Sequence, residues 1–139
     1  MGKVIVSALV ENLDDLSDER RGRLPSDQVR RVEVDDALVD SGASGLLMPK
    51  RLVSQLGLTP LRIREAKTVG GTVPVQVYRA VRLTIQGRDC ILDVTEIADD
   101  LPVLIGQLPL ESMDWVIDMK GHKLIGNPAH GGEQMIEAY

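Results

Sequence analysis

Short apolar runs separated by turn signals are the feature that most constrains the fold of this chain. Runs rich in valine, isoleucine and leucine, which pack well on a pleated sheet, end repeatedly at glycine, proline or aspartate. The many expected strands indicate an all-β fold, because only one or two short helices, near residues 49–56 and 109–113, accompany them. Hairpin turns are expected at Gly70-Gly71 and at residues 86–89. The expected strands cover residues 3–10, 29–39, 63–69, 73–85, the stretch from the second hairpin turn to residue 97, 103–105, 115–119 and 123–125.

A chain of 139 residues fits a single domain, residues 1–139. Hydrophobic residues make up 43% of the chain, and because phenylalanine is absent the core must be mainly aliphatic. The charged segment at about 11–27 is interpreted as a polar insertion between strands, with room for a short helical turn, and its mobility is left open. The glycine-containing segment from about residue 127 is predicted to be a flexible tail.

Composition and charge exclude several classes of function. The net charge of −5 and the scarcity of aromatic residues argue against binding nucleic acid, which needs cations for phosphates and rings for bases. No apolar run approaches the roughly 20 residues of a membrane helix, and residues 4–10 are better explained as a first strand than as a signal peptide. These features predict a cytoplasmic protein without a nucleic acid or membrane partner. Cys90 is expected to be a buried thiol, His122 and His130 lie in loops without metal-ligand spacing, and no metal or cofactor is expected.

Asp40 has the clearest chemical signature, because the apolar run Ala37-Leu38-Val39 delivers it to a glycine-rich turn. Gly42 would permit backbone angles that a larger residue resists, and Ala43 keeps the wall of the turn small. Ser41 carries a hydroxyl that can hydrogen-bond the backbone and help fix the loop. A carboxylate held in this way can move a proton in a reaction. The alternative is that Asp40 caps its own turn and has no further role.

The chain repeats part of this pattern at Leu104-Ile105-Gly106, where a second apolar strand runs into glycine before a short helix. The hairpin tipped by Gly70-Gly71 lies between the two. This order resembles the retropepsin-like aspartic proteases, and more closely their single-domain bacterial type than the viral enzymes. The resemblance covers residues 3–128 in element order, and its specific motifs are residues 40–43 and the later run into glycine.

The resemblance implies a closed β-barrel-like subunit that acts as a homodimer and cleaves a peptide or protein substrate as an aspartic endopeptidase. One Asp40 from each chain would form a catalytic pair around a water molecule. The resemblance also implies that the active-site loop is supported by Ser41, Gly42 and Ala43. The flap over the substrate would consist of Val69, Gly70, Gly71 and Thr72. The second loop, which packs beside the first, would consist of Leu104, Ile105 and Gly106. The substrate pockets are expected to be apolar, lined by residues such as Ala43, Leu46 and Val69.

The chain departs from the viral pattern where the viral enzymes have a supporting ion pair. Those enzymes typically place two aspartates after their Asp-Thr-Gly-Ala motif and an arginine after the later glycine. This chain has Ser44, Gly45 and Gln107 at these positions, which leaves open how the dimer is held. A peptide-binding or dimerisation module that keeps the fold without proteolysis is the alternative function, although the retention of Asp40 counts against it.

Overall fold

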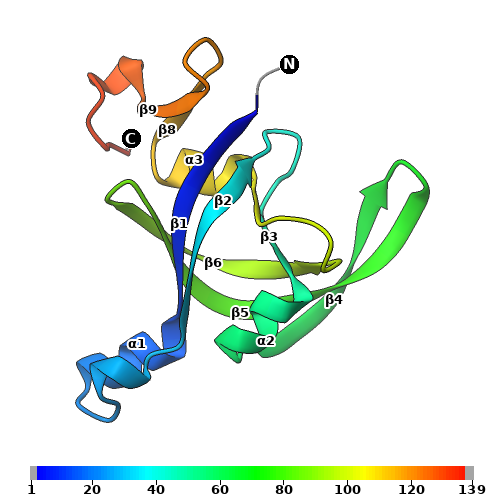
Figure 1. The fold of residues 1–139 in the computed structure, drawn as a ribbon, viewed down its shortest axis with the longest axis vertical. Helices are drawn as coiled ribbons and strands as arrows, with labels where there is room; N and C mark the ends of the chain where they lie inside the picture. The colour runs from blue at the N-terminus through cyan, green and yellow to red at the C-terminus, as the bar shows by residue number, and fades with distance from the viewer. Residues whose placement is uncertain (1–2, 137–139) are drawn as a thin grey trace.

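The computed structural model describes residues 3–136, and its centre is a closed β-barrel (Figure 1). Within that range, seven strands form one sheet in the order β1-β2-β7-β3-β6-β5-β4. An additional antiparallel pairing of β1 with β5 closes six of them into the barrel, and β4 continues outside it. The prediction of an all-β, barrel-like fold is therefore confirmed. The strands are β1 (Val4–Asn12), β2 (Arg31–Val39), β3 (Leu46–Pro49), β4 (Thr59–Thr68), β5 (Gly71–Ile85), β6 (Arg88–Ile97) and β7 (Leu104–Ile105).

Short helices and a separate hairpin surround the barrel. They are α1 (Leu13–Arg20), α2 (Lys50–Leu56), α3 (Gln107–Ser112), the hairpin of β8 (Trp115–Asp118) and β9 (Lys123–Gly126), and the 3₁₀ turns η1 (Ser26–Gln28) and η2 (Pro128–His130). Helix α2 starts one residue later than predicted, because Pro49 is its N-cap and still belongs to β3. It stops at Gly57, whose φ of 60° is the left-handed conformation that commonly ends a helix. Among the helices of residues 3–136, none has the length and apolar character needed to cross a membrane.

The two-residue strand β7 lies between β2 and β3, and this arrangement positions the turn that carries Asp40. Strand β7 pairs in parallel with the end of β2 and antiparallel with the start of β3. The segment 40–45, which joins β2 to β3, must therefore pass over the end of β7. Strand β3, which is not among the strands expected from the sequence, also pairs with β6. Both of its edges are thus occupied, and this fixes the far end of the turn.

Aliphatic side chains fill the barrel, as the absence of phenylalanine requires. Strand β1 shows the alternation of a half-buried strand, because every second residue from Val4 to Val10 points inward. Fully burying a side chain of leucine or isoleucine size contributes about 1.5–3 kcal/mol relative to leaving it exposed. The largest fully buried side chains are Leu46, Met48, Leu56, Leu83, Ile85, Ile105, Leu110 and Met113.

Strands β4 and β5 form a long hairpin that extends away from the barrel (Figure 1). After an irregularity between Pro60 and Arg62, the two strands stay in register up to the pair Thr68 and Gly71, so Val69 and Gly70 form the turn. The second half of β5 contributes core residues, whereas its first four residues and most of β4 are exposed. One strand therefore serves both the barrel and a projecting arm.

The charged insertion expected at about 11–27 is not a loose excursion, because α1 and η1 occupy most of it. Asn12 caps α1 by accepting a hydrogen bond from the Asp15 N–H at 3.0 Å, and its amide donates to the Leu56 carbonyl at 2.8 Å. The buried Asp15 carboxylate accepts three hydrogen bonds of 2.8–2.9 Å from the Arg30 backbone and guanidinium. The guanidinium holds the pKa of Asp15 below its usual range, so the pair is charged at neutral pH. The insertion is thereby fixed at both ends.

Residues 127–135, where the sequence predicts a flexible tail, contain the turn η2 and make hydrogen bonds to the residue before β8. The buried Asp114 carboxylate accepts hydrogen bonds from His130 Nδ1 at 2.6 Å, from the Asn127 amide at 3.1 Å and from the Met135 N–H at 3.1 Å. His130 is therefore a partly buried anchor of this segment, which corrects its interpretation as a surface loop residue. The segment is tied to Asp114, just before β8, and also to the barrel, because the guanidinium of Arg88 in β6 donates to the Gly132 carbonyl at 2.6 Å.

Candidate active site

Asp40 lies at the start of the turn after β2, and its carboxylate is partly exposed. Its backbone N–H donates to the Ile105 carbonyl at 2.9 Å, which continues the pairing of β2 with β7. Its own carbonyl accepts from the Ala43 N–H at 3.0 Å, and Oδ1 accepts from the Gly42 N–H at 3.0 Å. Oδ2 accepts no hydrogen bond from any described residue. One carboxylate oxygen is thus fixed and the other is available to solvent or a ligand.

Gly106 packs directly against this turn, at a position where a side chain would not fit. A Cβ at this position would lie 2.5 Å from the Ala43 carbonyl oxygen and 2.6 Å from the Gly45 carbonyl oxygen. Both carbonyls are engaged, because Gly106 N–H donates to Gly45 at 2.8 Å and Gln107 N–H donates to Ala43 at 2.9 Å. Ser44 joins the same set by accepting from the Leu108 N–H at 2.9 Å. The start of α3 therefore holds the Asp40 turn through main-chain hydrogen bonds.

Two details of the turn differ from expectation. Ser41 is exposed, and its hydroxyl makes no hydrogen bond within residues 3–136, so it does not fix the loop as predicted. Gly42 does not adopt a positive φ. Its contribution is close approach instead, because a Cβ there would lie 3.2 Å from the Asp40 Oδ1 that its own N–H binds. The small residue lets the chain bend back onto the carboxylate.

The predicted flap is the tip of the β4–β5 hairpin. The Thr68 hydroxyl donates to the Gly71 carbonyl at 2.6 Å and closes the turn, and Gly71 has a φ of 117° that strongly favours glycine. Val69 is fully exposed at the tip, and Val73 on the adjoining strand is 41% exposed. Apolar side chains at an exposed tip are well placed to contact a ligand. Thr72 is exposed beside them.

A groove of about 670 Å³ runs between this hairpin and the barrel. Asp40 itself does not line it; the nearest strand that does is β3, through Leu47. Leu46, one of the residues expected to line an apolar pocket, points the opposite way and is buried in the core. The strand alternation that assigns Leu46 inward also places Leu47 outward, and this signal could have found the lining residue. The groove is lined by Leu47, Lys50, Ala66, Lys67, Thr68, Val73, Pro74, Val75, Gln76, Thr95, Glu96, Ile97, Ala98, Asp99 and Leu101.

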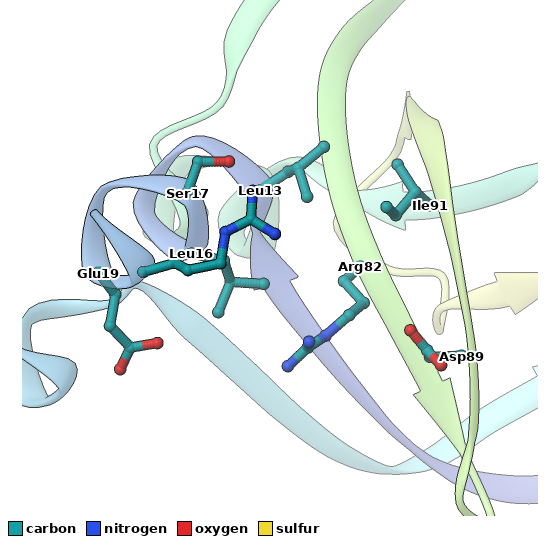
Figure 2. Close-up of a pocket in the computed structure, with 8 residues that line it drawn as sticks. Leu13, Leu16, Ser17, Glu19, Arg82, Asp89 and Ile91 are labelled. Atoms are coloured by element: carbon teal, nitrogen blue, oxygen red, sulfur yellow. The ribbon is translucent and has the colours of Figure 1, made fainter. Parts of the chain in front are cut away.

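A second cavity, of about 710 Å³, lies between α1 and the β5–β6 hairpin, and Figure 2 shows its lining side chains. Leu13 and Leu16 of α1 face Arg82 and Ile91 across it. The Arg82 guanidinium is bound to the buried Glu11 carboxylate at 2.8 Å, so its charge is already compensated. None of the residues expected at the site lies in this cavity.

The remaining reactive side chains lie apart from the Asp40 turn. Burial raises the pKa of the Cys90 thiol to about 11, in agreement with its expected role as a packing residue. Burial and the hydrogen bond to Glu96 raise the pKa of the Tyr78 hydroxyl, which therefore stays protonated at neutral pH. Within residues 3–136, no three His, Cys, Asp or Glu side chains are grouped so that they could hold a metal ion.

Comparison with known families supplies independent information about the region that carries the site. A family model described as aspartyl protease matches residues 28–108, more than half of the chain. The matched region runs from β2 through β7 and includes Asp40, the β4–β5 hairpin and Gly106. No curated protein matches the chain significantly.

Proposed function

We propose that this chain, which belongs to the aspartyl protease family of retropepsin-like bacterial proteins, is one subunit of a homodimeric endopeptidase in which each chain supplies Asp40. The observation that carries the proposal is the geometry of the Asp40 turn. One carboxylate oxygen is held by Gly42, the other has no hydrogen bond to a residue of the range 3–136, and main-chain hydrogen bonds from the start of α3 fix the turn. A carboxylate restrained in this way is prepared to exchange a proton with a water molecule.

The chemistry requires a second carboxylate beside the first. An ionised carboxylate takes a proton from water as the water oxygen attacks the carbonyl carbon of the peptide bond. A protonated carboxylate donates to the carbonyl oxygen, and the C–N bond breaks when the leaving nitrogen receives a proton. Two carboxylates this close share one proton readily, because both cannot easily carry a negative charge, as aspartic proteases in general illustrate. Since one chain offers one such turn, a two-fold axis that places Asp40 beside its symmetry mate is the economical solution.

Exposed apolar side chains beside the Asp40 turn support a second copy at this position. Leu108 is 61% exposed, although its backbone N–H is bonded to Ser44 in the turn. Val116 on β8 and Met119 just after it are also exposed, and β8 packs against α3. A dimer built about an axis through the turn would cover Leu108, because its residue is bonded to the turn, and would extend toward β8 through α3.

The groove beneath the β4–β5 hairpin supplies room for an extended substrate. The hairpin projects from the barrel (Figure 1) and carries exposed Val69 and Val73 near its tip. An extended peptide between the hairpin and the barrel would gain affinity from its backbone and selectivity from its side chains. The hairpin therefore serves as the flap of the proposed enzyme.

The replacement of Asp40 by Asn tests the assignment directly. We expect Asp40→Asn to keep the fold but to lower peptide cleavage by at least about 10²–10⁴-fold, the usual contribution of a general acid or base. Cleavage of a mixed peptide library, read by mass spectrometry from pH 4 to pH 8, is the measurement. Asp36→Asn is the matched control, because Asp36 is an exposed carboxylate on β2, the strand that leads to Asp40. Full activity in purified Asp40→Asn protein would exclude Asp40 as the catalytic residue.

Subunit mixing tests the shared site separately. Wild-type and Asp40→Asn chains that have exchanged subunits in equal amounts would contain about one quarter wild-type dimer. Activity should then fall to about one quarter of that of the same total amount of wild-type protein. A fall to one half would show that each chain acts alone. Sedimentation of both proteins gives the dimer content, and an intact dimer that never cleaves peptide would favour the non-proteolytic alternative.

A further inference from the structure

We propose that the groove beneath the flap selects peptides with an acidic side chain flanked by apolar ones, and that Lys50 and Lys67 are the specificity-determining residues. The proposal rests on the function proposed above and adds a substrate class to it. The groove is bordered by both lysines, one from each of its two sides. Lys50 is the first residue of α2, and Lys67 is near the end of β4 on the flap.

Neither lysine has a partner elsewhere in the described chain. Both side chains are exposed, and neither forms a hydrogen bond or an ion pair with a residue of the range 3–136. An ammonium group without a partner keeps its full attraction for an incoming carboxylate, because no existing contact must first be broken. Two such groups on facing walls can bind one carboxylate between them.

The carboxylates that border the groove are, in contrast, already engaged. Glu96 Oε1 accepts a hydrogen bond from the Tyr78 hydroxyl at 3.1 Å. Asp99 Oδ1 accepts from the Arg51 N–H at 2.8 Å, in the first turn of α2, and the Arg51 guanidinium reaches the Asp99 carbonyl at 3.1 Å. The Asp99 carboxylate thus stabilises the start of α2, because the N-terminal end of a helix dipole is positive. Both carboxylates keep their negative charge but have hydrogen-bond donors within the described chain, whereas the ammonium groups of Lys50 and Lys67 have no partner there.

Apolar side chains form much of the remaining surface that a substrate would meet, beside the polar residues Thr68, Gln76 and Thr95. Leu47, Ile97 and Leu101 come from the barrel side, and Val73 and Val75 come from the flap. Leu101 is 42% exposed, so it can still lose water-accessible surface when a ligand binds. A peptide that presents an acidic residue between apolar residues matches both the charge and the apolar lining.

The position of the groove places this acidic residue away from the bond that is cut. Leu47 lies on β3, and β7 separates β3 from the strand that carries Asp40. Two strand spacings are on the order of 10 Å, and an extended peptide crosses that distance in about three residues. Lys50 lies three residues beyond Leu47, so the acidic side chain is expected at least about three residues from the scissile bond and takes no part in the chemistry.

Charge-matched peptides and a pair of charge-reversed variants test the proposal. Three labelled peptides would share an apolar sequence and carry Glu, Gln or Lys at one position. The same set of three would be made for each position along the peptide. Binding is measured by fluorescence anisotropy with Asp40→Asn protein, and kcat/KM is measured with wild-type protein. We expect the Glu peptide to bind about 3-fold more tightly than the Gln peptide and about 10-fold more tightly than the Lys peptide, since exposed ion pairs are individually weak.

The variant K50E/K67E should reverse this order, and 0.5 M salt should weaken both preferences. Both lysines are exposed, and a glutamate at the first position of α2 suits the helix N-terminus, so the variant is expected to fold. The control R21E/R23E makes the same change in net charge on the exposed loop after α1 and should keep the wild-type order.

The possible outcomes separate this proposal from the proposed function. Charge-dependent binding without any cleavage would support acidic selection and count against the protease assignment. Cleavage without a charge preference would support the protease assignment and overturn acidic selection. An order unchanged in K50E/K67E, or no binding of any peptide at about 1 mM, would also overturn it.

Discussion

Replacing Gly106 by alanine should damage the Asp40 turn through one added methyl group. Gly106 has a φ of −91° and a ψ of −170°, a conformation that alanine adopts without backbone strain. The added Cβ would nevertheless lie 2.5 Å from the Ala43 carbonyl oxygen and 2.6 Å from the Gly45 carbonyl oxygen. Because both oxygens belong to the main chain, no side-chain rotation can relieve the contact. The turn or the start of α3 must move by several tenths of an ångström or more.

The magnitude follows from what this movement disturbs. Overpacking a filled site costs about 1–3 kcal/mol. The bonds from Gly106 and Gln107 to the two carbonyls, now 2.8 and 2.9 Å long, would be stretched or lost, and each contributes about 1 kcal/mol. We expect Gly106→Ala to lower the free energy of unfolding by about 3 kcal/mol, a fall in Tm on the order of 10 °C for a chain of this size. Movement of Asp40 by about 1 Å would lower peptide cleavage by about 100-fold.

Urea unfolding at fixed protein concentration, together with the peptide cleavage assay, measures both effects. Gly45→Ala is the matched control on the same turn, because a Cβ there meets no atom within 4 Å. It should change the free energy of unfolding by less than about 1 kcal/mol and leave most of the activity. Wild-type stability and activity in Gly106→Ala would refute the view that close packing of these carbonyls holds the Asp40 turn.

Two further predictions concern titratable side chains outside the turn. The hydrogen bond from His130, with that from Met135, holds the pKa of Asp114 below its ordinary value. The stability that this carboxylate contributes is therefore fully present above about pH 4. It is lost as the pH falls through the lowered pKa. The difference in unfolding free energy between wild type and Asp114→Asn, measured in urea from pH 7 to pH 3, should narrow at the acid end, and a constant difference would contradict this. Burial raises the pKa of the Cys90 thiol from 9.0 to about 11. Iodoacetamide should therefore react with native protein at pH 8 about 100-fold more slowly than with urea-unfolded protein. Similar rates for the two would show that the thiol is accessible and ionised in the native protein.

The sequence predicted the strand content well, because its turn signals are local. The hairpin turn at residues 86–89 is an example: Gln86 and Gly87 both adopt positive φ, and Ile85 pairs with Arg88 around them. The aliphatic core followed from composition in the same way. Such features depend on residues that are neighbours in the chain, and the sequence lists these directly.

Features that depend on distant residues were predicted less well. Helix α1 has little apolar periodicity to reveal it, and the contacts that fix it join Asn12 to Leu56 and Asp15 to Arg30. His130 appeared to be a loop residue because its partner, Asp114, is 16 positions away and lies in a left-handed conformation. In each case a buried polar group needed a partner that local pattern could not supply.

The candidate site shows the same difference between local features, which the sequence predicts, and features that depend on distant residues. Asp40 and Gly106 were identified from two short motifs, and the structure brings the turn after one against the other. None of the residues expected to line the pockets, Ala43, Leu46 and Val69, lines the groove. Leu46 was misplaced because β3, whose alternation turns it inward, was not among the expected strands. Lys50 and Lys67 were not noticed, because they are 17 residues apart in the chain and face one groove only after β4 folds back along β5.

The missing viral ion pair has a structural counterpart in this chain. At the positions where viral enzymes place charged partners, Gly45 and Ser44 instead accept main-chain hydrogen bonds from Gly106 and Leu108. The Gln107 side chain turns away to donate to Glu111 at 2.9 Å within α3, while its backbone N–H binds the turn. None of the main-chain groups that hold the turn gains or loses a proton between pH 3 and pH 9, and none is screened by salt as a surface ion pair would be. The turn should therefore keep its shape over the acid range in which two facing carboxylates share a proton, so a loss of activity there in protein that stays folded would be a property of the carboxylates or of the dimer.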